Sequence, residues 1–193
     1  PFGYLLEKYK NEKTAILWID AHPDVTTTAD NWKNFHAMVL ASLLGEADKD
    51  IDNLITTKVK PENVIFAGID DSREFDRVVY NKYNFKNFTT EEFQKNGDKI
   101  VKELKNRKIK NVIVHFDLDV LNLYEFNSQY FAEPEIFDKY KHEFPVGAKI
   151  STVSKLINDV NDNFNLIGLG ITEHLPWAAI KLAKLLQELP LIK

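Results

Sequence analysis

Four runs of apolar and largely β-branched residues constrain the fold of this chain more than any other feature. They cover residues 15–19, 64–69, 112–116 and 166–171. A strand with one face in water alternates apolar and polar residues, whereas these runs are nearly continuous, which is typical of parallel strands buried on both faces. Helical spacing of apolar residues is found in the segments between them. This alternation of strand and helix predicts an α/β fold with a mainly parallel sheet.

The predicted helices are marked by capping residues and by apolar residues at helical spacing. They cover residues 30–45, 73–83, 89–104, 151–160 and 177–189. Asp30 is placed to cap the first of them and Gly45 to end it. Thr89 and Glu92 have the spacing of a capping box. The stretch 122–149 is the least regular part of the sequence, and we expect it to form a long loop beside the site.

The 193 residues and their composition predict one domain, residues 1–193, long enough to bury a large core. The net charge of −4 gives no general attraction to nucleic acids or anionic membranes. No apolar run approaches the roughly 20 residues of a membrane span. The chain has no cysteine, which excludes disulfides and thiolate metal ligands and fits a reducing compartment. We therefore expect a cytoplasmic protein that binds neither nucleic acid nor membrane.

Two short acidic clusters follow predicted strands. Asp20, His22 and Asp24 lie in WIDAHPD, and Asp117 and Asp119 lie in HFDLDV. Residues at every second position of an extended chain project from one face, so each cluster can converge on a point. Converging carboxylates cannot all stay ionised unless positive charge lies among them. Oxygen ligands with an occasional imidazole suit hard or borderline divalent metals, so the clusters predict a site for more than one metal ion.

A third acid, Glu173, follows the fourth predicted strand in the segment IGLGITEHLPW. Sites in open α/β sheets form at the carboxyl ends of the strands, which is where all three groups of acids fall. His115 lies on the same strand face as Asp117 but deeper, and we interpret it as a core or supporting histidine rather than a ligand. The sequence thus predicts one acidic site at one edge of the sheet.

At these motifs the chain resembles the arginase family of ureohydrolases, which includes agmatinase and formimidoylglutamase. DAHPD is similar to the family's Asp-Ala-His-x-Asp motif, and Asn34 with His36 is similar to its Asn-x-His. FDLDVLN is similar to Phe-Asp-x-Asp-x-x-Asp with Asn122 in place of the last aspartate, and GLGITEHLPW is similar to the late segment that supplies a glutamate. The resemblance implies a three-layer α/β sandwich and, for the complete protein, a homo-oligomer that is a trimer or hexamer.

The resemblance also implies a binuclear Mn²⁺ centre. Asp20 and Asp117 would bridge the two ions, Asp24 would bind one ion, and His22 with Asp119 would bind the other. A hydroxide held between the ions would attack the carbon of a guanidinium or amidine, because two cations lower the pKa of that water and orient it. The implied activity is hydrolysis of a linear C–N bond in a small guanidino or formimino substrate.

Three further residues receive roles from the same resemblance. His36 would shuttle protons, Glu173 would pair with the cationic end of the substrate, and Asn34 would contact its far end. The family's remaining ligand histidine, in a Gly-Gly-Asp-His motif, would fall just before Pro1, so we expect the chain to lack the N-terminal portion of the family fold. A non-catalytic or regulatory arginase-like protein that has lost a metal ligand is the alternative to an enzyme. A metallophosphoesterase would need additional Gly-Asn-His and His ligands, which we do not find.

Overall fold

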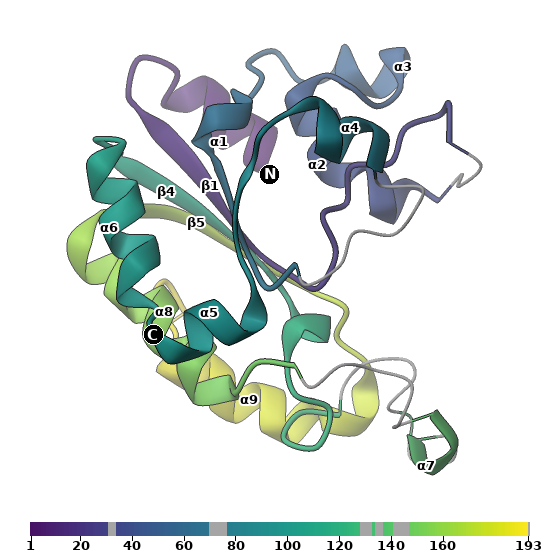
Figure 1. Ribbon diagram of the computed structural model, residues 1–193, viewed down its shortest axis with the longest axis vertical. Coiled ribbons are helices and arrows are strands. Elements are labelled where there is room, and N and C mark those ends of the chain that lie inside the picture. Colours follow the sequence, from purple (N-terminus) through teal and green to yellow (C-terminus); the bar gives the residue numbers. More distant parts are fainter. Residues whose placement is uncertain (31–33, 70–76, 128–132, 134–136, 141–146, 193) are drawn as a thin grey trace.

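A five-stranded parallel sheet with helices against both of its faces forms the framework of the protein (Figure 1). The computed structural model describes residues 1–30, 34–69, 77–127, 133, 137–140 and 147–192. The strands lie in the order β3-β2-β1-β4-β5, and each neighbouring pair is parallel. They are β1 (Thr14–Ile19), β2 (Val64–Ala67), β3 (Lys86–Phe88), β4 (Asn111–Asp117) and β5 (Asn165–Thr172). The predicted α/β fold with a mainly parallel sheet is confirmed.

α-Helices form a large part of the remaining described chain. They are α1 (Phe2–Lys8), α2 (Val39–Leu44), α3 (Lys49–Asp52), α4 (Arg77–Lys82), α5 (Thr90–Lys95), α6 (Asp98–Asn106), α7 (Phe137–Tyr140), α8 (Ile150–Asn163) and α9 (Ala179–Glu188). The predicted helix over residues 89–104 is divided into α5 and α6 at Asn96 and Gly97. Across the part of the chain that the structure describes, none of these helices is long and apolar enough to cross a membrane.

All four predicted strands are present, but the sequence analysis missed β3. This strand has three residues at the edge of the sheet, and only Phe88 is buried, so no apolar run marks it. Phe88 pairs with Ala67 of β2. Strands β4 and β5 extend beyond the predicted runs to Asp117 and Thr172, which brings both strands to the acidic edge of the sheet.

Hydrophobic cores on both faces of the sheet explain why the strands are continuously apolar. In β1, Leu17 packs into one core and Trp18 into the other, and both side chains are fully buried. Helices α5, α6, α8 and α9 cover the first face, and α1, α2 and α4 cover the second (Figure 1). Because successive side chains point to opposite faces, both sets of positions are apolar when both faces are covered.

The helix predicted over residues 30–45 begins later than expected. Asp30 does not cap it, because its Oδ2 atom accepts hydrogen bonds from the backbone nitrogen of Thr27 at 2.6 Å and from the Thr27 hydroxyl at 2.9 Å. Residues 31–33 lie outside the described residues. A 3₁₀-helix, η1 (Phe35–Met38), leads into α2, and Gly45 ends α2 in the left-handed conformation with φ of 81°. Of the helix predicted over residues 73–83, the structure describes α4, since residues 70–76 are not among the described ones.

The capping box predicted at the start of α5 is confirmed. The Thr89 hydroxyl accepts a hydrogen bond from the backbone nitrogen of Glu92 at 3.3 Å, and the Glu92 carboxylate accepts one from the backbone nitrogen of Thr89 at 3.0 Å. These two bonds satisfy donors that the first turn of a helix otherwise leaves unpaired. The box fixes the start of the helix that places Phe93 in the core.

The described part of the stretch 122–149 is anchored to the rest of the fold. Leu121 forms an isolated bridge with Ala148, and Phe126 is fully buried in the core on the face of the sheet that α5, α6, α8 and α9 cover. Tyr124 contacts Phe137 of α7 edge-on, with ring centroids 5.7 Å apart. The described residues of this stretch thus include a short helix, α7, which the sequence analysis did not predict.

Gly68 links the sheet to the acidic edge. It follows β2 with φ of 118°, and a Cβ atom at this position would lie 2.7 Å from the backbone oxygen of Asp20 and 2.4 Å from Cγ2 of Val120. Backbone in this conformation is rarely adopted by residues with a side chain. Glycine is therefore required here by conformation and by the close approach of the chain around Asp20.

We expect Gly68→Ala to lower the free energy of unfolding by about 1–3 kcal/mol, because the methyl group is both strained and crowded. The matched control is Gly97→Ala, since Gly97 has φ of −60° and the nearest atom to an added Cβ is the Phe93 carbonyl oxygen at 3.6 Å. The control is expected to change stability by less than about 0.5 kcal/mol. Urea unfolding followed by circular dichroism measures both, and equal effects of the two substitutions would contradict the assignment.

Candidate metal centre

The carboxyl ends of three neighbouring strands bring the acidic residues to one edge of the sheet. Strand β1 pairs with β4 up to Ile19 and Phe116, and β4 pairs with β5 up to Asp117 and Thr172. The next residue after each pairing belongs to the acidic set, with Asp20 after β1 and Glu173 after β5. Parallel pairing in this register therefore places acids that are far apart in the sequence side by side.

Asp20 is held in place by hydrogen bonds to both of its carboxylate oxygens. Its side chain is 2% exposed. Oδ1 accepts a hydrogen bond from the backbone nitrogen of His22 at 2.7 Å, and Oδ2 accepts one from the indole nitrogen of Trp18 at 2.9 Å. The same indole nitrogen lies 3.1 Å from the carbonyl oxygen of His22, to which it also donates. Trp18 thus fixes both the carboxylate and the turn that carries His22.

Asp119 forms the closest charged contact in the site. Its Oδ2 atom lies 2.7 Å from Nδ1 of His22, and its Oδ1 atom accepts a hydrogen bond from the backbone nitrogen of Ala21 at 3.2 Å. Burial opposes ionisation of Asp119, but the hydrogen bond and charge of His22 outweigh it and lower the pKa of this carboxyl. Contacts within the chain therefore favour the ionised form of Asp119, in contrast to Asp20 and Asp117.

Asp117 is a buried carboxylate held by its neighbours on β4 and β5. Its Oδ2 atom accepts a hydrogen bond from the Thr172 hydroxyl at 2.5 Å, and its Oδ1 atom accepts one from the backbone nitrogen of Asp119 at 2.9 Å. Burial raises the pKa of Asp117 well above its ordinary value, and the charges of Asp119 and Glu173 raise it further. The hydrogen bonds reduce this effect without cancelling it.

Burial and neighbouring charges act on Asp20 in the same way. Burial raises its pKa well above the ordinary value, and the negative charges of Asp119, Asp117 and Asp24 add to the shift. Two buried carboxyls whose ionisation is opposed by their surroundings indicate a place that favours added positive charge. A divalent cation among them would supply that charge and would return both groups to the ionised state.

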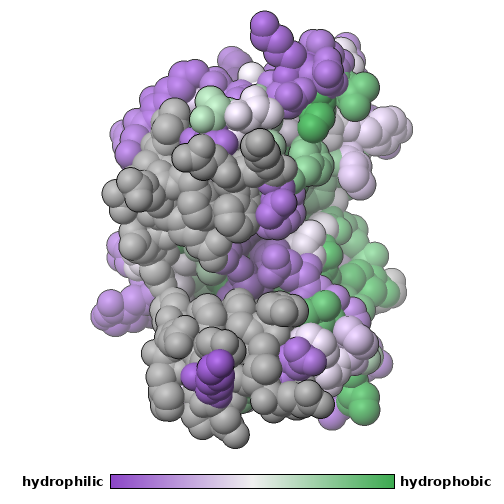
Figure 2. Space-filling model, turned by 90° about the vertical axis from the view of Figure 1, so that its right-hand side faces the viewer, coloured by the Kyte–Doolittle hydropathy of each residue, from purple (hydrophilic) through white to green (hydrophobic). Residues whose placement is uncertain are grey.

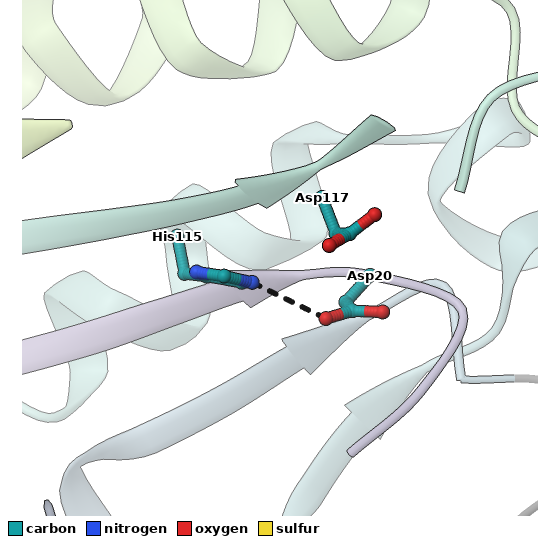
Figure 3. A group of neighbouring side chains, drawn as sticks. All are labelled: Asp20, His115 and Asp117. Carbon is teal, nitrogen blue, oxygen red and sulfur yellow. Dashed lines mark ion pairs between the residues drawn. The ribbon is translucent and has the colours of Figure 1, made fainter. Parts of the chain in front are cut away.

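His115 lies beside these carboxylates, one pleat deeper along β4 than Asp117 (Figure 3). Its ring stacks on Trp18 with centroids 3.7 Å apart, and its Nε2 atom lies 3.3 Å from Oδ2 of Asp20. Burial lowers the pKa of His115 to about 4, so the ring is neutral at pH 7. Nε2 is buried and makes no hydrogen bond to the described residues. A neutral imidazole with a free ring nitrogen facing carboxylates is able to donate its lone pair to a cation.

The donor atoms form three overlapping groups that could each hold an ion. In each group the three donor atoms lie within 4.8 Å of one another. The groups are Asp20 with His115 and Asp117, Asp20 with His22 and Asp119, and Asp117 with Asp119 and Glu173. All donors are carboxylate oxygens or imidazole nitrogens, which suits Mn²⁺, Zn²⁺ or another borderline divalent ion. The residues present therefore fit a metal centre with more than one position.

The remaining predicted site residues take different places. Asp24 lines the same cavity, and its backbone oxygen accepts hydrogen bonds from Leu40 and Ala41 near the start of α2. His36 is exposed in η1 and lines the cavity. Asn34 is exposed at the N-cap of η1 and is not among the residues that line the cavity. The role predicted for Asn34 therefore has no geometric support and stays a prediction.

The acidic edge opens into a cavity of about 900 Å³. Hydrophilic residues gather in the middle of the face seen in Figure 2, and hydrophobic residues gather along one side of that face. The cavity contains the predicted acids Asp20, Asp24, Asp117, Asp119 and Glu173. A small molecule that enters it reaches the carboxylates directly.

Sequence reasoning missed two contacts that shape the site. The Trp18 indole and the Thr172 hydroxyl each donate to a carboxylate. Thr172 has a usable signal, because it occupies the last position of a strand immediately before Glu173. The signal for Trp18 is its spacing, since it lies in β1 two residues before Asp20, which directly follows the strand.

Comparison with known sequences places the chain near one family. A model of the arginase family matches residues 4–126. The arginase of Staphylococcus aureus (strain COL) is 33% identical over 113 residues, which are 55% of this chain and 37% of that protein. The arginase of Plasmodium berghei (strain Anka) is 27% identical over 180 residues, which are 89% of this chain and 48% of that protein. The chain therefore spans between about a third and half of the length of these curated relatives.

Solved structures confirm the arginase-like α/β fold. Entamoeba histolytica arginase in complex with L-ornithine has a TM-score of 0.77 at 19% identity, covering 97% of this chain and 64% of that chain. Formimidoylglutamase from Bacillus subtilis has a TM-score of 0.63 at 21% identity, covering 86% of this chain and 47% of that chain. At these sequence identities, the similarity to the solved structures establishes a shared fold.

Burial and neighbouring charges oppose the ionisation of Asp117. We therefore expect Asp117→Asn to change stability in opposite directions without and with bound metal. Because the pKa of Asp117 is higher in the folded than in the unfolded chain, its contribution to metal-free stability falls as pH rises from about 4 through the folded pKa. Asp117→Asn removes this loss, so without metal we expect the variant to be more stable than the original chain at pH 8, by on the order of 1 kcal/mol. With Mn²⁺ we expect the order to reverse, because the variant lacks a carboxylate that belongs to two of the candidate metal-binding groups.

Urea unfolding in EDTA and in Mn²⁺, at pH 5 and pH 8, measures the difference in free energy of unfolding between the variant and the original chain. His115, with its pKa lowered to about 4, has the opposite pH dependence up to about 6.5, but it is present in both proteins and cancels in the comparison. The control is Asp162→Asn on exposed α8 surface, which should behave as the original chain does. An Asp117→Asn variant that is less stable in EDTA at pH 8 would contradict this account.

Proposed function

Because this chain belongs to the arginase family, we propose that it carries most of a binuclear Mn²⁺ centre that hydrolyses a linear C–N bond in small guanidino or formimino substrates. One observation supports this above the others. Two buried carboxylates with raised pKa values, Asp20 and Asp117, share overlapping donor groups with His22, Asp119 and Glu173 at the floor of one cavity. Such a density of buried acids is destabilising unless cations are bound among them.

The proposed ligands are the residues of the two acidic clusters. They are Asp20, His22, Asp24, Asp117 and Asp119, with Asp20 and Asp117 shared between the two ions. When bound, the two ions would lower the pKa of water to near neutrality and polarise the substrate carbon. His115 supports this set from below, since its neutral ring and its free nitrogen face Asp20.

Residues around the ligands hold them in position before a substrate arrives. Trp18 orients Asp20, and Thr172 orients Asp117, so neither carboxylate can rotate away from the cavity without losing a hydrogen bond. Glu173 is exposed at the cavity edge, with φ of 62°, where its carboxylate can pair with a planar cation such as a guanidinium. His36 lines the same cavity and is placed to exchange protons between the site and water.

The test is a substrate panel with added Mn²⁺. Arginine, agmatine, guanidinobutyrate and formiminoglutamate are supplied, and urea, formamide or ammonia is measured. We expect one of them to be hydrolysed, and Asp117→Asn to lower kcat by at least about 100-fold, because a bridging ligand is lost. Firm Mn²⁺ binding with no product from any member of the panel would favour the non-catalytic alternative instead.

Glu173 provides a second, finer prediction. For a cationic guanidino substrate we expect Glu173→Gln to raise KM by roughly 10-fold or more, because a charge-assisted hydrogen bond is replaced by a neutral one. The matched control is Glu91→Gln, since Glu91 lies on exposed α5 surface with 76% of its side chain accessible. An unchanged KM for Glu173→Gln would remove Glu173 from the substrate site while leaving the metal centre in place.

A further inference from the structure

A buried ring nitrogen of His115 has no hydrogen-bond partner among the described residues, and the proposed function gives this residue only a supporting place. The His115 side chain is 7% exposed, and its Nε2 atom is shielded from solvent. Native structures pair the great majority of their buried polar atoms, so an exception asks for a missing partner. Because the surrounding chain already shields Nε2, that partner is as small as a water molecule or a metal ion.

Carboxylate oxygens lie in front of this nitrogen. Nε2 lies 3.3 Å from Oδ2 of Asp20, and Figure 3 shows the His115 ring and the carboxylates of Asp20 and Asp117 turned toward one another. Of the three donor groups in the described part of the chain, this is the one whose members are all buried. Metal bonds to imidazole nitrogen and carboxylate oxygen are about 2.0–2.2 Å long, so neighbouring ligands of one ion lie roughly 3.0–3.4 Å apart. The separation of Nε2 and Oδ2 falls in this range, although the two atoms form no hydrogen bond.

The Asp20 carboxylate has a different histidine beside each of its two oxygens. Nδ1 of His22 lies 3.8 Å from Oδ1, and Nε2 of His115 lies 3.3 Å from Oδ2. His22 shares its donor group with Asp20 and Asp119, whereas His115 shares its donor group with Asp20 and Asp117. A carboxylate that binds one ion through each oxygen therefore has an imidazole available for both ions.

Trp18 holds both members of the pair formed by His115 and Asp20. Its ring stacks on the His115 ring with centroids 3.7 Å apart and an angle of 16° between the planes, and its indole nitrogen donates to Oδ2 of Asp20 at 2.9 Å. A carboxylate oxygen has two lone pairs, so Oδ2 can accept this hydrogen bond and still bind an ion. Ligands whose rotation is already restricted lose little conformational freedom on binding. The pair is therefore preorganised to bind an ion.

Resting on the metal centre of the proposed function, we propose that His115 is itself a ligand and binds through Nε2 the same ion as Oδ2 of Asp20 and the Asp117 carboxylate. His22 and Asp119 then bind the other ion, which is nearer to solvent because the His22 side chain is 27% exposed. Binding through Nε2 requires the ring proton of His115 to be on Nδ1. The two ions are thereby unequal, since the ion at His115 is enclosed by buried ligands and the ion at His22 is accessible to water and substrate.

Cadmium NMR tests whether Nε2 forms a bond to the ion. The protein is labelled with ¹⁵N at its five histidines and loaded with ¹¹³Cd²⁺, a diamagnetic divalent ion that accepts imidazole and carboxylate ligands. A nitrogen bound to ¹¹³Cd is split by one-bond coupling, whereas a histidine that only supports another ligand is not. We expect splitting at Nε2 of His115 and at Nδ1 of His22, and none at the exposed His174.

Removal of the donor atom gives an independent measurement. His115→Phe keeps a ring that can stack on Trp18 but has no nitrogen, so we expect the affinity for one ion to fall by at least about 100-fold, because loss of an outer partner alone costs 10–100-fold. Calorimetry with Mn²⁺ and with Cd²⁺ measures this change. The matched control is His174→Ala, since His174 is exposed and does not line the cavity, and it should leave both affinities unchanged. Splitting in the unsubstituted protein tests the inference even where His115→Phe does not fold.

The outcomes separate this inference from the proposed function. Bound Cd²⁺ without splitting at His115 overturns His115 as a ligand and leaves the metal centre standing. Splitting at His115 with no hydrolysis of any substrate in the panel supports the inference and counts against the hydrolase proposal. Failure of both Mn²⁺ and Cd²⁺ to bind overturns the inference and the proposed function together.

Discussion

Repulsion among buried carboxylates is the constraint on which the organisation of this molecule depends. Asp20 and Asp117 are almost fully removed from water, and each faces at least two other acids. Either charge alone would be destabilising, so the chain surrounds both with donors: the Trp18 indole, the Thr172 hydroxyl and backbone nitrogens at the turns. These donors hold the geometry but leave the pKa values raised. The raised pKa values of Asp20 and Asp117 are what make this edge of the sheet a candidate cation site.

The parallel sheet is what makes this concentration of charge possible. Strands β1, β4 and β5 are adjacent although they are separated by long stretches of sequence, and their carboxyl ends face the same side. Cores on both faces keep the strands rigid, so the carboxylates cannot relax apart. Gly68, beside the backbone of Asp20, shows how tightly the chain closes around the site. The same strand register therefore determines both the fold and the arrangement of the acidic residues.

The sequence predicted those features that come from repeated or local patterns. Continuous apolar runs identified β1, β2, β4 and β5, and capping chemistry identified Thr89 and Gly45 correctly. The prediction failed at Asp30, where a different local contact forms, and at β3, where pairing with another strand decides the structure. Asp30 bonds back to Thr27 instead of capping a helix, and β3 exists only because Lys86, Asn87 and Phe88 can pair with the edge of β2.

The candidate site shows the same division between local pattern and tertiary contact. The spacing of two residues grouped Asp20 with His22 and Asp117 with Asp119, and the strand-end rule added Glu173. The reason differs from the one predicted, because His22 lies in a turn after β1 and Asp119 lies in the 3₁₀-helix η4 (Leu118–Val120) rather than on an extended strand. Alternation also placed His115 beneath Asp117, but only the structure shows its free nitrogen 3.3 Å from Asp20. Asn34 is the converse case, because its place in a motif suggested a contact and the structure leaves it outside the cavity. Motif position specifies which residue types are available, whereas the fold decides which of them face the ligand.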